Sequence, residues 1–142
     1  MRTRLSLVVV GVGLLVLGAA PVMAHHAFSS EFDGNRPVKL TGVVTRMEWV
    51  NPHAWIHLDV KRPDGTVESW AVEGGTPNTL LRRGLRKTDL PSGTEITVDG
   101  YRAKDGGPRA SGRNLALPDG RALFLSNGAE GAPGDAPAQP PR

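Results

Sequence analysis

The 142-residue sequence contains no cysteine. This absence excludes disulfide bonds, a thiol nucleophile and lipid attachment through cysteine. Catalytic signatures are missing as well, because the chain has neither a Gly-x-Ser-x-Gly elbow nor a glycine-rich phosphate loop with the required spacing and flanks. We therefore predict a protein that is not an enzyme and whose fold is held together by packing alone.

Positive charge and aromatic residues are scarce for a nucleic-acid-binding protein. The formal net charge is +3, and without Arg2 and Arg4 only 15 basic side chains remain against 14 acidic ones. Aromatic residues make up 5% of the chain, and only Trp55 and Tyr101 are candidate stacking platforms. Binding of nucleic acid requires a concentrated basic face with stacked aromatic residues. The sequence therefore predicts no nucleic-acid partner.

The first 24 residues have the form of a signal peptide. Arg2 and Arg4 precede an apolar run from Leu5 to Leu17, and the small-residue site Val22-Met23-Ala24 follows it. The run is shorter than the roughly 20 residues that a membrane-spanning helix needs. We predict export to the periplasm or secretion, with no stable membrane insertion after cleavage. The alternative is that the segment is retained as an anchor.

The remaining chain divides into an N-terminal arm over residues 25–37, a β-barrel domain over residues 38–126 and a tail over residues 127–142. The tail contains no large apolar side chain and is rich in Gly, Ala and Pro. Such a composition cannot bury enough surface to offset the entropy of ordering, so we predict a disordered tail.

Alternating apolar residues and turn signals predict a mainly β fold with one short helix. Thr76 and Pro77 are typical of a helix start, and Gly84 of a helix end. The predicted order is a strand over Val38–Val50 that curls across Gly42, strands over His53–Lys61 and Thr66–Glu73, the helix over Thr76–Gly84, a strand over Thr94–Ala103, and a hairpin of Arg109–Leu117 with Arg121–Leu125. This order favours a small OB-like Greek-key β-barrel, with the helix between strands 3 and 4. An open sandwich is the alternative.

The strand that begins at His53 carries the main functional signal. Successive strand residues point to opposite faces, so one face receives Ala54, Ile56, Leu58 and Val60, and the other receives His53, Trp55, His57 and Asp59. Two residues four apart on a strand are separated by roughly 13 Å, because each residue rises about 3.3 Å. One metal ion shared by the two histidines therefore needs a bulge or a further partner.

The other histidines, His25 and His26, would open the mature chain after cleavage at Ala24. A terminal amine beside an imidazole chelates copper(II), which nitrogen donors bind more tightly than other common divalent ions. We predict a periplasmic metal-binding protein, for copper and then zinc, that combines His25 or His26 with His53 or His57. Asp59 would orient a ligand. The alternative is that the histidines are solvated and titrate without binding metal.

A second hypothesis is an interaction module that binds an envelope protein or a small ligand through the face of Trp55 and Asp59. Exposed tryptophans are favoured interface anchors, whereas Trp49 and Trp70 are expected in the core. Asp59 and Glu73 are a further candidate pair across neighbouring strands. A basic cluster, Arg82, Arg83, Arg86 and Lys87, is either solvated surface or a contact for a partner.

Several segments together resemble a known family. They are His25-His26-Ala27-Phe28, Glu31-Phe32-Asp33, Leu40-Thr41-Gly42, Glu48-Trp49-Val50-Asn51-Pro52-His53, the pair Trp70 and Glu73, and Val98-Asp99-Gly100. The domain from His25 to Leu125 is similar to the small exported bacterial proteins named domain of unknown function 6152. The resemblance implies a periplasmic single domain built as a small β-barrel. It implies no catalytic residue, substrate or activity.

Overall fold

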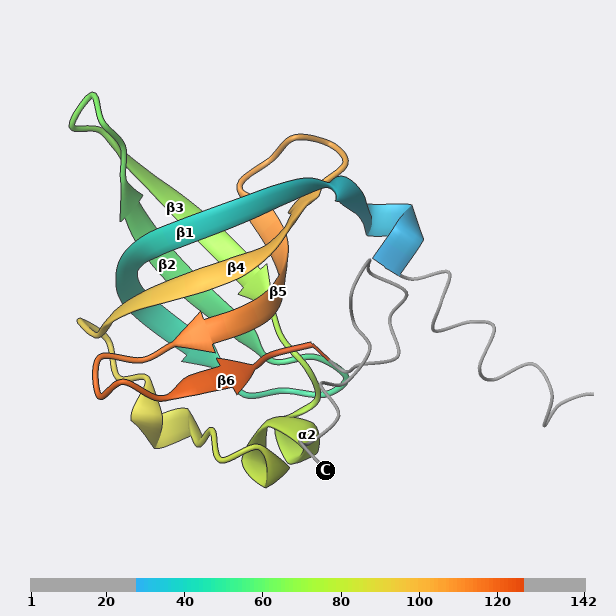
Figure 1. Cartoon of the computed structure of the whole chain (residues 1–142), viewed down its shortest axis with the longest axis vertical. Helices are drawn as coiled ribbons and strands as arrows, with labels where there is room; N and C mark the ends of the chain where they lie inside the picture. The colour runs from blue at the N-terminus through green and yellow to red at the C-terminus, as the bar shows by residue number, and fades with distance from the viewer. Residues whose placement is uncertain (1–27, 127–142) are drawn as a thin grey trace, which may run out of the picture.

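A computed structural model describes residues 28–126 of the chain. Its elements follow in the order β1 (Phe32–Glu48), β2 (Trp55–Lys61), β3 (Val67–Glu73), α2 (Pro77–Arg82), the 3-10 turn η1 (Lys87–Asp89), β4 (Glu95–Ala103), β5 (Arg109–Ala116) and β6 (Ala122–Phe124) (Figure 1). Residues 28–31 form a helical turn ahead of β1. Within residues 28–126, no helix has the length and apolar character needed to span a membrane. The predicted signal peptide and tail lie outside the described residues.

The strands form one sheet that closes on itself. Their order is β3-β2-β1-β4-β5-β6, and an additional pairing joins β3 to β5. This closing pair is parallel and short, with Ala71 opposite Arg109 and Glu73 opposite Ser111, whereas the other pairs are antiparallel. Strands β1 to β5 close the barrel, and β6 extends the sheet beside β5. A closed sheet of this order with a helix between strands 3 and 4 is the OB-like Greek-key barrel. The predicted fold class is confirmed, and the closure excludes the open sandwich.

β1 is long enough to serve two neighbours. Its first part pairs with β4, and from Val43 onward it pairs with β2. A Cβ atom at Gly42 would lie 2.6 Å from the carbonyl oxygen of Asp59, so only glycine fits where β1 passes β2. The pairing shifts register between Val44 and Arg46, two residues beyond the predicted bend. Gly42 therefore allows β1 to approach β2 closely, and the register shift that accompanies the curl of β1 lies in the residues that follow it.

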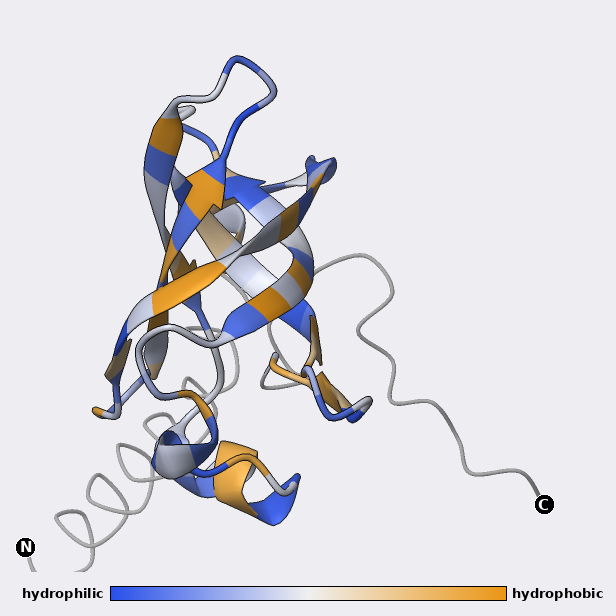
Figure 2. Cartoon of the chain, turned by 90° about the vertical axis from the view of Figure 1, so that its left-hand side faces the viewer, coloured by the Kyte–Doolittle hydropathy of each residue, from blue (hydrophilic) through white to orange (hydrophobic). Residues whose placement is uncertain are grey.

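Apolar side chains from every wall of the barrel fill its interior, and hydrophobic and hydrophilic residues alternate along the strands (Figure 2). The inward row of β2 is buried as predicted, with Ile56 and Leu58 at 1% and 0% exposure. Trp70 also lies in this core, and Trp49 packs against it. The predicted core placement of these two tryptophans is confirmed, while the outward row of β2 faces solvent in part.

A second, smaller apolar cluster fixes the start of the described chain. Phe28, Phe32, Tyr101 and Ala103 are buried together, and the ring of Phe28 meets the rings of Phe32 and Tyr101 with centroids 5.8 Å apart in both pairs. β1 therefore begins at Phe32 rather than at the predicted Val38. Tyr101 is 7% exposed in this cluster, so it does not form a platform beside Trp55.

α2 and η1 cover the lower end of the barrel as drawn in Figure 1. Thr76 caps α2 by accepting a hydrogen bond from the N–H of Thr79, and Pro77 occupies the first turn, as predicted. Leu80 and Leu85 are buried, whereas Leu81 is 48% exposed. The short helix has room to bury only one side, and Leu81 falls outside it.

Candidate functional site

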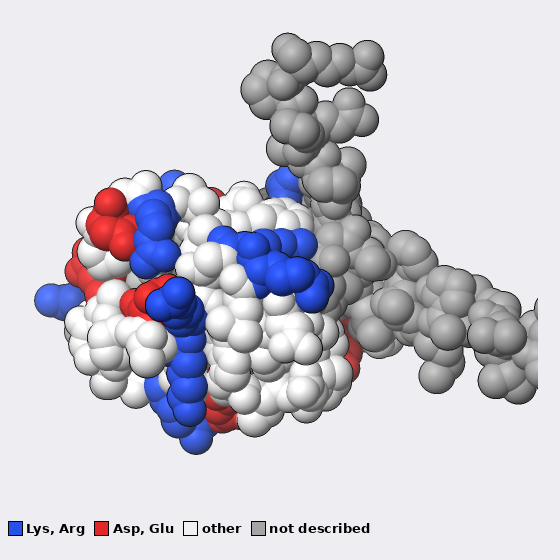
Figure 3. Space-filling view, turned by 90° about the horizontal axis from the view of Figure 1, so that it is seen from below, with Lys and Arg blue, Asp and Glu red and all other residues white. Residues whose placement is uncertain are grey.

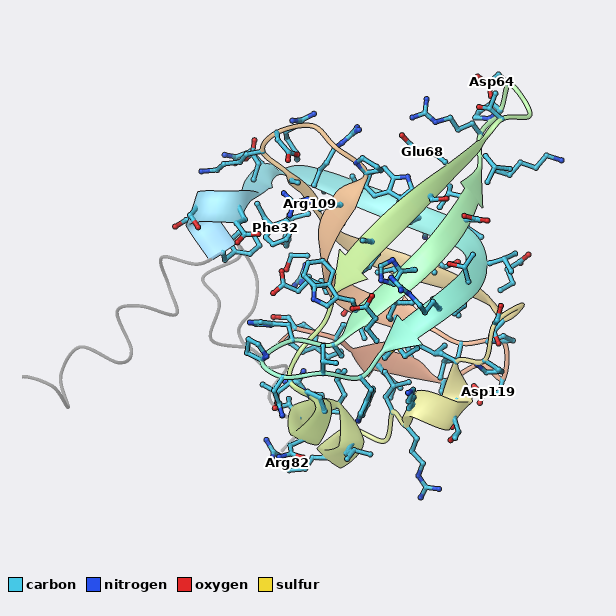
Figure 4. All side chains as sticks on the ribbon, turned by 180° about the vertical axis from the view of Figure 1, so that it is seen from behind. Phe32, Asp64, Glu68, Arg82, Arg109 and Asp119 are labelled. Atoms are coloured by element: carbon cyan, nitrogen blue, oxygen red, sulfur yellow. The ribbon has the colours of Figure 1, made fainter. Side chains whose placement is uncertain are left out.

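The candidate site is the outer face of β1, β2 and β3, which we call the histidine face and define by Glu48, His53, Trp55, His57 and Glu73. Trp55 in β2 pairs with Glu48 in β1 and with Glu73 in β3, so the three residues form one row across the sheet. In Figure 4 the β2–β3 hairpin lies on the near side, with Asp64 at its tip and Arg82 at the opposite end of the domain.

His53 is held from the β3 side of the face. Its Nδ1 atom lies 3.0 Å from the Glu73 carboxylate and 3.2 Å from the carbonyl oxygen of Gly74. Both atoms are acceptors, so Nδ1 must carry the proton and donate. A ring that donates through Nδ1 keeps the lone pair of its neutral form on Nε2. The side chains of His53 and Glu73 are 27% and 15% exposed, which shelters their contact from full solvent screening.

His57 is held from the β1 side. Its Nε2 atom lies 3.0 Å from a Glu48 carboxylate oxygen and 3.1 Å from the guanidinium of Arg46. The same Glu48 oxygen is 2.5 Å from the Arg46 guanidinium, so the three side chains form one triangle. Arg46 can only donate and Glu48 can only accept, so they make opposite demands on this ring nitrogen. The contacts of His57 therefore do not select one tautomer, in contrast to those of His53.

The other residues predicted for this face have separate roles. Asp59 accepts a hydrogen bond of 2.7 Å from the hydroxyl of Ser69, its direct partner in β3. The predicted pairing of Asp59 with Glu73 is wrong, because the strand register places Glu73 opposite Trp55. Trp55 itself is half-buried in the middle of the face, between the two histidine–carboxylate pairs.

The structure brings each histidine of β2 to its own carboxylate and keeps the two pairs on opposite sides of Trp55. His53 leans on β3 and the segment that follows it, whereas His57 leans on β1. Over residues 28–126, no three His, Asp or Glu side chains gather closely enough to hold one metal ion. His25 and His26 lie outside the described residues, so their predicted share in a composite site stays a prediction.

The sequence reasoning missed the roles of Glu48 and Arg46, and it gave Glu73 the wrong partner. A signal was present, because Glu48 ends β1 shortly before the Asn51-Pro52 segment that leads into β2. Consecutive antiparallel strands pair near their connection, so a residue at the end of the first lies beside one at the start of the second. That rule places Glu48 near Trp55 and His57, as observed.

The hairpin tip beyond the histidine face carries its own fixed charges. The hydroxyl and then the N–H of Thr66 donate to Asp64 and lower the pKa of its carboxyl below the usual 3.8. A hydrogen bond from Arg62 lowers the pKa of Glu68, which also accepts from the indole N–H of Trp70 at 2.8 Å. These contacts tie the base of the hairpin to the core through Trp70.

Comparison with known proteins places the chain by family and not by activity. No curated protein matches it. Among solved structures it is similar to the N-terminal domain of PriB protein from Thermoanaerobacter tencongensis, described as a dimeric structure, at 20% identity over 58% of this chain and 96% of that chain, with a TM-score of 0.37. A family model matches residues 13–112, which is most of the described domain. The chain therefore belongs to the family of unknown function DUF6152, as the resemblance of its segments implied.

Proposed function

We propose that this protein is a non-enzymatic binding protein of the bacterial envelope, periplasmic or secreted, that binds a transition-metal ion through its histidines. Copper(II) is the favoured ion and zinc(II) is next, because imidazole and amine nitrogens rank copper above the other common divalent ions. The observation that carries the proposal is the position of the His53 Nδ1 atom, 3.0 Å from the Glu73 carboxylate and 3.2 Å from the carbonyl oxygen of Gly74.

Metal-binding histidines usually donate one ring N–H to a carboxylate or a backbone carbonyl, which orients the ring and makes the other nitrogen a better ligand. His53 has both kinds of acceptor at one nitrogen. Nε2 is then the coordinating atom. Since His57 is held from the other side of Trp55, we assign His53 to the metal site and treat His57 as an alternative ligand.

The remaining ligands are the terminal amine and imidazoles that cleavage at Ala24 would expose. His25 stands three residues before Phe28, which is buried against Tyr101. Three extended residues span about 10 Å. The proposal therefore requires that a chain of this length bring the His25 amine from Phe28 to the Nε2 atom of His53. An amine, one or two imidazoles of the arm and His53 would give copper(II) three or four nitrogen donors.

Calorimetric titration of the mature protein with copper(II), then with zinc(II), tests the proposal. We expect one copper site at least roughly tenfold tighter than a free His-His peptide, and we expect His53→Ala to remove that excess. Circular dichroism of each variant shows whether the fold is kept. A copper affinity equal to that of the peptide, or unchanged in both His53→Ala and His57→Ala, contradicts the composite site.

A matched pair of carboxylate variants identifies the histidine that binds. Glu73→Gln removes the charge that orients His53 and should weaken copper binding by roughly 10- to 100-fold. Glu48→Gln makes the same chemical change beside His57 and should leave the affinity within about twofold of wild type. The reverse pattern would assign the site to His57. Equal small effects from both variants would show that neither carboxylate orients the metal-binding histidine.

The placement of Trp55 favours a second candidate function, which is an interaction module. Trp55 is half-buried at the middle of the histidine face and is flanked by Glu48 and Glu73. A central aromatic residue with a polar surround is typical of an interface anchor. Envelope proteins retained by wild type and by Trp55→Ala should then differ. Identical sets of retained proteins would count against this function.

A further inference from the structure

The segment from Leu81 to Lys87, which joins α2 to η1, forms a surface at the lower end of the barrel that we call the basic tip. Leu81 is 48% exposed there, and Arg82, Arg86 and Lys87 are exposed around it. Leu80 and Leu85 are fully buried and attach the segment to the core. The tip therefore presents one apolar side chain and three cations on an anchored backbone.

The basic tip is smaller than the predicted cluster of four basic residues. The Arg83 guanidinium donates to the carbonyl oxygens of Phe124 and Ser126 and lies 4.9 Å from the centre of the Phe124 ring. This side chain ties α2 to the end of β6 and is a structural element. Arg86, Lys87 and Arg82 remain as the exposed cations of the segment.

These three cations differ in their surroundings from the arginines that form ion pairs within the domain. Four other arginines lie within 4.0 Å of a carboxylate, in the pairs Arg46–Glu48, Arg62–Glu68, Arg109–Asp105 and Arg121–Asp119. Arg82 donates to the hydroxyl of Thr79, and none of the three tip cations pairs with a carboxylate of residues 28–126. Asp89, the nearest acid in sequence, contacts Arg121 and the backbone N–H of Arg86. The tip therefore presents three neighbouring cations whose charge no ion pair within residues 28–126 offsets.

The shape of this end suits a flat partner. α2 and η1 stand out from the barrel in both side views, and the Arg82 side chain is directed away from the domain (Figures 1, 2 and 4). Seen from below, Lys and Arg side chains lie in groups around an uncharged area, and Asp and Glu lie mostly toward the margins (Figure 3). Within the described residues, this end of the domain thus presents the exposed Leu81 together with Arg82, Arg86 and Lys87.

We propose that the basic tip docks on a membrane surface rich in anionic phospholipid. Cations near such a surface each contribute about 1 kcal/mol of attraction, or roughly a fivefold change in partitioning, so three contribute roughly 100-fold. An exposed leucine among the cations adds apolar contact at the headgroup boundary. The residues of the basic tip are not those of the histidine face, so variants at the tip leave the ligands of the proposed metal site unchanged.

Sedimentation with lipid vesicles tests the proposal, with the natively processed protein as the sample. We expect binding to phosphatidylglycerol vesicles and little binding to pure phosphatidylcholine vesicles. The triple variant Arg82→Gln, Arg86→Gln, Lys87→Gln should lose roughly 100-fold in partitioning. The single variant Leu81→Ser should lose the part of the vesicle binding that persists at high salt.

The matched control is the triple variant Arg36→Gln, Lys39→Gln, Lys61→Gln. These cations are also exposed and have the same total charge, but they lie on β1 and β2. The control should bind like wild type. Equal losses in both triple variants would show that only net charge matters and would overturn the proposal. Binding to soluble polyglutamate as tight as to vesicles, without a contribution from Leu81, would overturn it in favour of an acidic protein partner.

Discussion

Replacing Gly42 with alanine should destabilise the barrel at the point where β1 passes from β4 to β2. The added Cβ would lie 2.6 Å from the Asp59 carbonyl oxygen and 3.0 Å from Cγ2 of Val60. The nearer atom belongs to the backbone, so relief requires β1 and β2 to separate. Overpacking of this kind costs about 1–3 kcal/mol, which outweighs the roughly 0.4–1 kcal/mol that a Gly-to-Ala change gains from the unfolded chain.

The matched control is Gly74→Ala. A Cβ at Gly74 would meet its nearest atom, the Ala54 carbonyl oxygen, at 3.6 Å, which is an ordinary contact. Thermal unfolding followed by circular dichroism should show Gly42→Ala melting several degrees, and up to about 20 °C, below wild type. Gly74→Ala should melt at or slightly above wild type. A Gly42→Ala variant as stable as Gly74→Ala would refute the claim that close approach at Gly42 sets the curl of β1.

Three further predictions concern the helix cap, the hairpin tip and the core. Thr76→Ala removes the acceptor for the N–H of Thr79 and should cost about 1 kcal/mol in urea unfolding. Thr66→Val removes the hydroxyl that donates to Asp64, so the pKa of that carboxyl should rise toward 3.8 in an NMR titration. Because folding lowers this pKa, the stability it contributes is present above pH 3.8 and is lost as pH falls through the folded value. Leu58→Ala empties a fully buried site and should cost about 2–5 kcal/mol. An unchanged unfolding midpoint would contradict the reason given for Thr76→Ala or for Leu58→Ala. An unchanged titration of Asp64 would contradict the reason given for Thr66→Val.

Much of the fold could be predicted because local signals agreed with tertiary packing. The alternation from Ala54 to Val60 assigned the two faces of β2, and the burial of Ile56 and Leu58 confirms it. Thr76 and Pro77 marked the helix start, which fixed the helix between strands 3 and 4. That position alone distinguished the OB-like barrel from other small β folds.

The start of β1 could not be predicted, because a tertiary contact overrides local turn chemistry. Asp33-Gly34-Asn35-Arg36-Pro37 has the composition of a turn, yet the strand runs through it. Pro37 is tolerated since this part of β1 has only β4 as a neighbour, so its missing N–H is not needed on the other side. Burial of Phe28 and Phe32 against Tyr101 holds the segment in place.

The candidate site was only partly predictable for a different reason. The face on which a side chain lies can be predicted from the sequence of one strand. Its hydrogen-bond partners can be predicted only when the register between neighbouring strands is known. The shared face of His53, Trp55 and His57 followed from alternation alone. The partner Glu73 depends on the β2–β3 register, which places it opposite Trp55. The partner Glu48 depends on the β1–β2 register, which shifts after Val44, although its place at the end of β1 was a usable signal.

The short closing pair between β3 and β5 leaves the far part of the β2–β3 hairpin outside the barrel. Only Ala71 to Glu73 join β5, and the hairpin tip projects away at the upper left of Figure 1. The tip is closed by its own hydrogen bonds, from Arg62 N–H to the Thr66 carbonyl and from Gly65 N–H to the Arg62 carbonyl. Extra residues or a fluorescent reporter placed at residues 63–65 would extend a self-contained loop and leave the barrel seam intact. This turn is therefore the natural attachment point for following the protein in cells.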